Sequence, residues 1–141
     1  MHSVELIWNK GLNFSVSQDG HTFEIDGSEE FGGKDLGPRP KALLLSALAG
    51  CSSMDIVSML EKMKHTDFTF KIKVDAELNN EHPIVYTKAH ITYLFEGEDL
   101  NSKNIIKAVS LSEDKYCGVS AILKKAFPIT SEIILNGDKI K

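Results

Sequence analysis

The segment Ala42–Cys51 constrains the fold of this chain more than any other part of the sequence. It reads ALLLSALAGC and is apolar almost all the way round a helix. Pro40 precedes it, as a proline in the first turn of a helix would, and good helix formers continue to Lys64. A helix without a polar face must be buried in a protein core or in an interface. The run is far shorter than the ~20 residues that span a bilayer, so no membrane association is predicted.

Alternating patterns before this helix predict strands. Val4–Trp8, Leu12–Ser17 and His21–Asp26 are expected to form three antiparallel strands, with a hairpin turn at Asp19-Gly20. The following segment, Ser28–Pro40, holds three Gly and two Pro and is expected to be a long loop. Long loops in compact domains are usually functional or cover another part of the molecule.

The pattern after the helix completes an α+β domain. Phe68–Leu78 alternates as FTFKIKVDAEL, and Ile84–Phe95 continues the alternation, so both are predicted to be strands. Asn101–Ser112 and Val119–Ala126 are expected to be helical, with an interruption at residues 114–118, and Phe127–Leu135 a closing strand. No repeat or separate linker is visible, and residues 1–141 are expected to form a single domain.

The charge balance excludes several partners. Sixteen Lys and Arg residues against twenty Asp and Glu give a net charge of −4, which argues against a nucleic-acid or anionic-lipid partner. The first residues, MHSVELIWNKG, contain no basic segment followed by an apolar one, so no signal peptide is expected. With only two cysteines, a reducing cytoplasm is the expected compartment.

Few residues offer catalytic chemistry. The sequence has no phosphate-binding glycine loop and no G-x-S-x-G motif, and its five histidines match no zinc spacing. Cys51 lies in the apolar helix, where a thiol is by default inert, whereas Cys117 precedes Gly118 at the start of a short helix, which favours the thiolate. The residues alone leave three interpretations open, with two inert core thiols ahead of a redox pair and of a metal site.

Two segments resemble one known family. GPRPKALLLSALAGCSSMDIVSMLEKMK is similar to the central helix of the OsmC/Ohr family of osmotically inducible and organic-hydroperoxide-resistance proteins, and YCGVSAIL to its second cysteine motif. Cys51 and Cys117 lie 66 positions apart, which is also similar to the family's separation. The resemblance covers most of the chain and implies N-terminal β-hairpins, a central buried helix, an antiparallel sheet and a second helix. It further implies an intertwined homodimer whose central helices pack back to back.

The resemblance also implies a redox chemistry that needs no cofactor. It implies that Cys51 is the peroxidatic thiolate, which attacks an organic hydroperoxide or hydrogen peroxide and becomes a sulfenic acid. Cys117 is then implied to resolve the sulfenic acid as a disulfide. An external thiol, in the family often a dihydrolipoyl protein, is implied to reduce that disulfide as part of oxidative-stress defence.

The sequence departs from the family at the group that holds the activating arginine. Active members hold that Arg with a Glu ten residues before the first Cys, and here the position is Lys41. Arg39, the only arginine, is the expected activator of Cys51 if its loop brings it near, and otherwise a solvated or carboxylate-bound side chain. Lys41 is a further candidate cation. The departure supports an alternative function, an OsmC-like protein that binds a small ligand and has little or no peroxidase activity.

Overall fold

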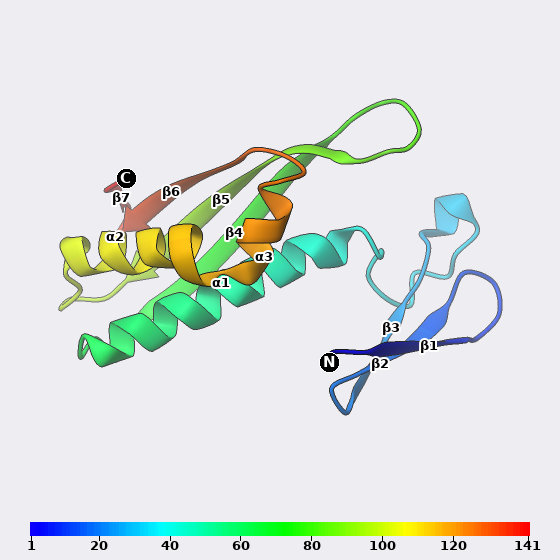
Figure 1. Cartoon of the computed structure of the whole chain (residues 1–141), viewed down its shortest axis with the longest axis horizontal. Coiled ribbons are helices and arrows are strands. Elements are labelled where there is room, and N and C mark those ends of the chain that lie inside the picture. Colours follow the sequence, from blue (N-terminus) through cyan, green and yellow to red (C-terminus); the bar gives the residue numbers. More distant parts are fainter. The chain divides into compact units, whose positions relative to one another are not determined.

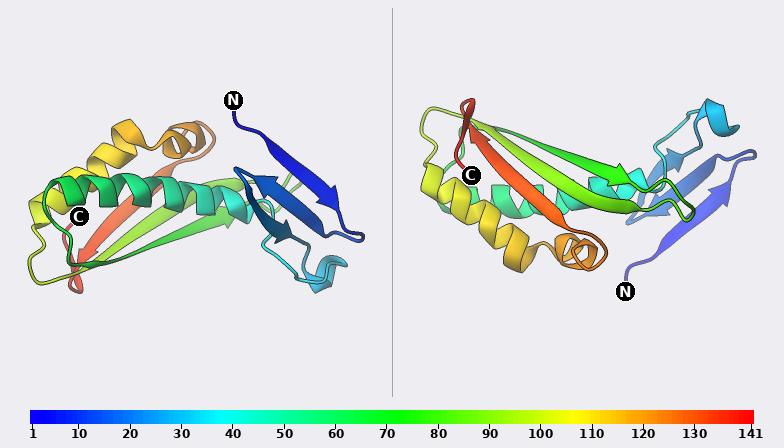
Figure 2. Two further views of the ribbon diagram at one scale, coloured as in Figure 1. Left: turned by 90° about the horizontal axis from the view of Figure 1, so that it is seen from below. Right: turned by 90° about the horizontal axis from the view of Figure 1, so that it is seen from above.

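The computed structural model describes the whole chain, Met1–Lys141, and divides it into two compact units, Met1–Leu44 and Leu45–Lys141. The first unit contains a three-stranded antiparallel sheet in the order β1-β2-β3, shown in blue in Figures 1 and 2. Its strands are β1 (Val4–Trp8), β2 (Phe14–Gln18) and β3 (His21–Ile25). The three predicted strands are thereby confirmed, with shifts of one or two residues at their ends.

The hairpin between β2 and β3 forms where the sequence predicts it. Asp19 and Gly20 both have positive φ, at 50° and 78°, and Gln18 pairs with His21. Two left-handed residues give a tight turn whose twist matches that of the flanking strands. The turn therefore fixes the register of the two strands.

The loop after β3 is more structured than the sequence indicates. It contains a short 3₁₀ helix, η1 (Glu29–Phe31), and its backbone is tied to Asp26. The Asp26 carboxylate accepts hydrogen bonds from the N–H groups of Gly27, Lys34 and Leu36 at 2.7, 3.2 and 3.3 Å. Burial opposes the charge, but these three N–H groups and the Arg39 guanidinium hold the pKa of Asp26 below its ordinary value.

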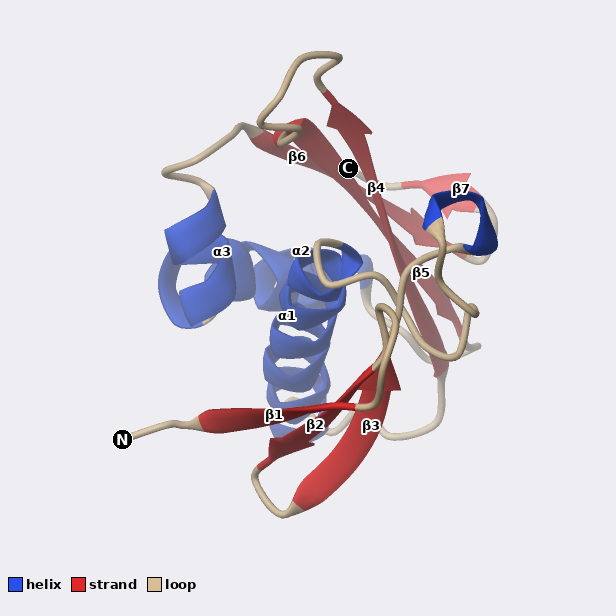
Figure 3. Ribbon diagram, turned by 90° about the vertical axis from the view of Figure 1, so that its right-hand side faces the viewer, coloured by secondary structure: helices blue, strands red, loops and turns tan.

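The second unit is a sheet with helices on one face, as Figure 3 shows. The strand order is β4-β5-β6-β7. The elements in chain order are α1 (Ala42–Lys62), β4 (Thr69–Leu78), β5 (Tyr86–Glu96), α2 (Ser102–Leu111), a π-helical turn η2 (Ser112–Tyr116), α3 (Gly118–Leu123), β6 (Ile129–Leu135) and β7 (Asp138–Lys139). The α+β class and the predicted order of elements are confirmed.

The expectation of an antiparallel sheet is confirmed only in part, because β4 pairs with β5 and β6 with β7 in antiparallel fashion but the middle pair is parallel. β5 pairs with β6 in parallel, from Ala89 opposite Ile129 to Phe95 opposite Leu135. The chain between them runs through α2, η2 and α3, and a crossover of this kind is what parallel neighbours require. The expected interruption at residues 114–118 is also wrong in part, because η2 continues the helical path to Tyr116. The two-residue strand β7 was not predicted.

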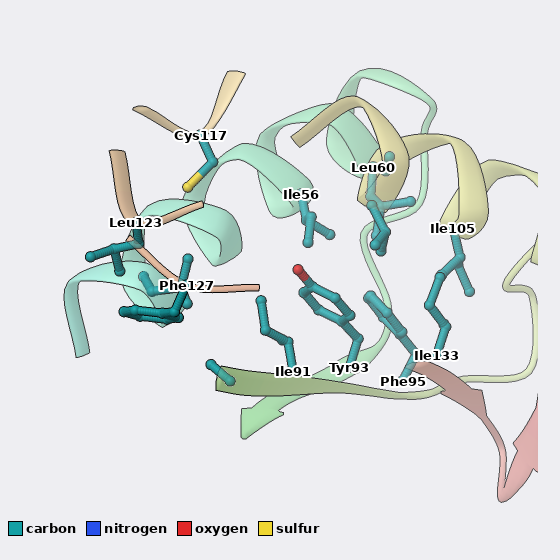
Figure 4. Packing of buried hydrophobic residues seen from close by; sticks show 14 residues of the cluster. Ile56, Leu60, Ile91, Tyr93, Phe95, Ile105, Cys117, Leu123, Phe127 and Ile133 are labelled. Carbon is teal, nitrogen blue, oxygen red and sulfur yellow. The ribbon is translucent and has the colours of Figure 1, made fainter. Parts of the chain in front are cut away.

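The core of the second unit lies between β5 and the helices (Figure 4). Every second residue of β5 faces inward, as alternation predicts, and Phe70 of β4 stacks on Phe95 with 4.5 Å between ring centroids. α1 buries one stripe against this layer, with its buried positions spaced four residues apart. These positions are Leu48, Ser52, Ile56 and Leu60.

The opposite face of α1 is not covered by the rest of the second unit. Met54, which lies on the side of the helix opposite the buried stripe, is 76% exposed. By length and composition alone this 21-residue helix could cross a membrane, a test that the core helix of a soluble protein also passes. Burial inside a single chain therefore accounts for only one side of the apolar segment.

Candidate functional site

The fold of the second unit brings the two cysteines together. Cys51 lies on α1, and Cys117 lies between η2 and α3, where it is the N-cap of α3. Both are free thiols, and their sulfur atoms lie within 4.8 Å of each other. Two of the three predicted site residues therefore share one site.

Cys117 is the enclosed member of the pair. It is 3% exposed, and its Sγ accepts hydrogen bonds from the Ser120 backbone N–H at 3.3 Å and from the Ser52 hydroxyl at 3.4 Å. Burial raises the pKa of the Cys117 thiol, the two hydrogen bonds oppose that change, and the neighbouring Cys51 adds to it. The expectation that the helix N-terminus favours the thiolate is therefore wrong, because desolvation outweighs the cap.

Cys51 is the accessible member of the pair. Its side chain is half-buried and packs against the edge of the hydrophobic core. A solute that approaches the site from outside therefore meets the sulfur of Cys51 before that of Cys117. This arrangement is compatible with a redox pair as well as with two inert thiols at the core.

Asp55 is a member of the site that the sequence analysis missed. One of its carboxylate oxygens lies within 4.8 Å of both sulfur atoms, and the Ser112 hydroxyl donates to its Oδ2 at 3.2 Å. Cys51 and Asp55 are four positions apart on α1, which places them on the same face of the helix. That spacing was the one signal in the sequence that could have identified Asp55.

A buried tyrosine lies beneath the site. The Tyr93 hydroxyl, which Figure 4 shows pointing from β5 toward the helices, donates to Glu113 Oε1 at 3.1 Å. Tyr93 has no exposed surface, and burial together with the Glu113 carboxylate raises its pKa far above the ordinary value. The phenol therefore stays protonated and donates a fixed hydrogen bond to the turn η2.

A groove of about 440 Å³ borders the site between α1, α2 and η2. Asp55 lines it, Met59, Met63 and Leu111 make its apolar part, and two lysines contribute cations. The full lining is Asp55, Ser58, Met59, Lys62, Met63, Lys107, Leu111 and Tyr116. An apolar organic molecule of modest size fits such a surface.

The two candidate cations belong to the first unit. The Arg39 guanidinium donates to Asp35 Oδ1 at 2.6 Å and to the Gly37 carbonyl at 2.8 Å. Arg39 is thus a carboxylate partner within its own loop, which was one of the two expectations for it. Its contact with Cys51, and that of Lys41, stay predictions.

Comparison with known proteins places these observations in one family. Residues 32–132 match the family described as OsmC-like protein. The protein YhfA of Escherichia coli strain K12 is 35% identical over 124 residues, which cover 87% of this chain and 90% of YhfA. A hypothetical protein from Aquifex aeolicus VF5 has a TM-score of 0.81 at 27% identity, over 96% of this chain and 98% of that one.

Solved structures of similar fold include organic hydroperoxide resistance proteins. An organic hydroperoxide resistance protein OsmC from Legionella pneumophila has a TM-score of 0.66 at 15% identity, over 95% of this chain and 96% of that one. At that identity the likeness concerns the fold alone.

Proposed function

This chain belongs to the OsmC-like protein family, and on that premise we propose that it reduces organic hydroperoxides or hydrogen peroxide with its two thiols. The observation that carries the proposal is the pairing of a half-buried sulfur, on Cys51, with an enclosed one, on Cys117, less than 4.8 Å away. A peroxidatic thiol must be reachable by peroxide, and a resolving thiol must be close enough to close a disulfide. The organic-hydroperoxide-resistance proteins with this fold support the proposal.

The reaction has three steps. The Cys51 thiolate attacks the terminal oxygen of the peroxide, the O–O bond breaks, and the products are the Cys51 sulfenic acid and an alcohol, or water when hydrogen peroxide reacts. The Cys117 sulfur then attacks the sulfenic sulfur, which forms the disulfide and releases water. A dihydrolipoyl group or another external dithiol reduces this disulfide by thiol exchange and is itself oxidised to a disulfide.

Arg39 is the proposed cation that stabilises the Cys51 thiolate. Its ion pair with Asp35 leaves 41% of the arginine side chain and 61% of the aspartate side chain exposed. Exposed pairs of this kind contribute about 0 to 1 kcal/mol, so exchanging Asp35 for a thiolate costs little. Lys41, at the position of the family's glutamate, is the second candidate.

We further propose that the protein acts as a cytoplasmic homodimer. The uncovered apolar face of α1, which includes Met54, lies one turn from Cys51 and needs a covering surface. A second copy of α1 packed back to back supplies an apolar surface of the same kind.

The groove supports a second candidate function. It offers apolar methionine and leucine side chains beside two lysines, and the family's glutamate is replaced by Lys41. An OsmC-like protein that binds a small apolar ligand, with little peroxidase activity, fits both observations. In that case the protein is expected to bind the ligand, and the number of free thiols is expected to stay unchanged after treatment with peroxide.

Two cysteine variants test the peroxidase proposal. With cumene hydroperoxide and dihydrolipoic acid, Cys51→Ser is expected to reduce peroxide consumption to the uncatalysed rate. Cys117→Ser is expected to stop at the Cys51 sulfenic acid, which dimedone traps and mass spectrometry identifies. Ser53→Ala, on the same helix, is the matched control and should keep the wild-type rate. Unchanged consumption by Cys51→Ser would refute the assignment of the nucleophile.

A further inference from the structure

The donor atoms around the two thiols are arranged like three ligands of a metal ion. Cys51 Sγ, Cys117 Sγ and a carboxylate oxygen of Asp55 all lie within 4.8 Å of one another. In a tetrahedral zinc site, with Zn–S near 2.3 Å and Zn–O near 2.1 Å, donor atoms lie roughly 3.6 to 3.8 Å apart. The three donors approach that spacing before any ion draws them together.

Neighbouring groups hold two of the three donors in place. Asp55 Oδ2 accepts from the Ser112 hydroxyl, while Cys117 Sγ accepts from the Ser120 N–H and the Ser52 hydroxyl. Hydrogen bonds to the ligands of a metal orient them and strengthen binding. Cys51 and Asp55 are also one helical turn apart, a spacing that lets two ligands on one helix bind the same ion.

The charge of the donor set also favours a cation. Once an ion displaces the two thiol protons, two thiolates and one carboxylate carry three negative charges, and the Asp55 carboxylate takes part in none of the ion pairs of the chain. A divalent cation would neutralise most of this charge in a site that is partly shielded from water. The sulfur donors select thiophilic ions over magnesium or calcium.

We propose that Cys51, Asp55 and Cys117 bind a thiophilic divalent cation, Zn²⁺, in the reduced protein only. Binding displaces the two thiol protons, and the fourth coordination position stays open to water or another small ligand. Formation of the Cys51–Cys117 disulfide removes two of the three ligands, so the ion is released on oxidation. The proposal does not depend on peroxidase activity, because it needs only the reduced thiols and the carboxylate.

A metal titration of the full-length protein tests the site. The protein is first reduced, freed of metal and transferred to buffer without reductant. Co²⁺ is then titrated in as the probe, and Zn²⁺ is added afterwards as a competitor. We expect one ion per chain, a thiolate-to-cobalt charge-transfer band, and visible bands of tetrahedral intensity. Zn²⁺ is expected to abolish these bands, and diamide oxidation to prevent them. Absence of the charge-transfer band at saturating Co²⁺, or binding that persists after oxidation of both thiols, would overturn the proposal.

Substitutions distinguish the residues that bind the ion from residues that do not. Cys51→Ser removes a ligand and should weaken Zn²⁺ binding at least about 100-fold. Ser112→Ala removes the hydrogen bond that orients the Asp55 carboxylate and should weaken Zn²⁺ binding about tenfold. Asp55→Asn keeps the shape of the side chain and should also weaken Zn²⁺ binding. Asp75→Asn is the control, because the Asp75 carboxylate pairs with Lys73 on β4, and this variant should bind Zn²⁺ as tightly as wild type. Circular dichroism checks that each variant is folded. Equal affinity in Cys51→Ser, Asp55→Asn and wild type would refute the assigned ligands.

Metal binding and peroxidase activity are measured in separate experiments. Peroxide consumption is measured with a chelator present, so that no Zn²⁺ occupies the thiols. Zn²⁺ is then expected to protect both thiols from peroxide in a second measurement. A metal site without peroxidase activity, or the reverse, identifies which of the two proposals fails.

Discussion

At the scale of single residues, the site depends on a difference between two chemically identical side chains. Cys51 is half-buried and Cys117 is buried, and only the surroundings distinguish them. Burial favours the neutral thiol at Cys117, which suits a group that must wait while peroxide reacts at the other sulfur. The order of reaction thus follows from accessibility.

Alkylation should report the raised pKa of Cys117. In the Cys51→Ser variant, Cys117 is expected to react with iodoacetamide more slowly at pH 7 than an ordinary thiol, because burial raises its pKa and so lowers the fraction of thiolate. The rate should rise with pH through a midpoint above the ordinary value of about 8.5, because the thiolate forms only above the folded pKa. In denaturant the difference should vanish. A midpoint below 8.5 in the folded protein would contradict this account of the site.

At the scale of elements, capping side chains define where the helices of the second unit begin. Asn101 Oδ1 accepts from the N–H groups of Lys103 and Asn104 at 2.9 and 3.3 Å, which starts α2. Cys117 caps α3 in the same way with its sulfur. The starts of both helices are therefore fixed by local hydrogen bonds.

The cap of α2 can be tested by equilibrium unfolding. Asn101→Ala is expected to lower the free energy of unfolding by about 1 kcal/mol, because two backbone N–H groups lose their acceptor. Asn101→Asp keeps the acceptor and should remain close to wild type. Urea denaturation followed by circular dichroism measures both. An alanine variant as stable as wild type, or an aspartate variant as unstable as alanine, would show that the cap does not stabilise α2.

Local patterns predicted most elements of this fold but not how they pair. The alternation FTFKIKVDAEL predicted β4 to within one residue, and Asp19-Gly20 predicted the hairpin. Alternation is the same in parallel and antiparallel strands, so it did not reveal the parallel pairing of β5 with β6. The turn η2 lacked a signal because the sequence SEDKY favours a loop as much as a helix.

The candidate site was predictable only in part. The meeting of Cys51 with Cys117 came from the family resemblance, since a separation of 66 positions says nothing about distance in space. Asp55 was visible as the residue one turn after Cys51, but a single carboxylate on a helix is usually solvated. Its proximity to Cys117 depends on the path of η2, which the sequence pattern did not define.

At the scale of the whole molecule, the apolar face of α1 offers a surface on which a second chain could pack. Met54 is 76% exposed and Val57 is half-buried on the side of α1 away from the sheet. A helix this apolar is unstable in contact with water over its whole outer face. The homodimer proposed above would cover it.

Sedimentation should detect this association. The wild-type protein is expected to sediment as a dimer at micromolar concentration. Met54→Glu should weaken the dimer at least about tenfold, because a buried unpaired carboxylate costs well over 1.4 kcal/mol. Ile122→Glu, at a 68% exposed position on α3, is the control and should stay dimeric. A monomeric wild-type protein would contradict the proposed assembly.

The central claim is that the sulfurs of Cys51 and Cys117 form one redox pair within a chain. Counting free thiols after adding one equivalent of cumene hydroperoxide to the reduced, metal-free protein tests it most directly. We predict the loss of both thiols in each chain, with a Cys51–Cys117 cross-linked peptide in the digest and no disulfide-linked dimer on a non-reducing gel. An unchanged thiol count, or a disulfide that joins two chains, would contradict it.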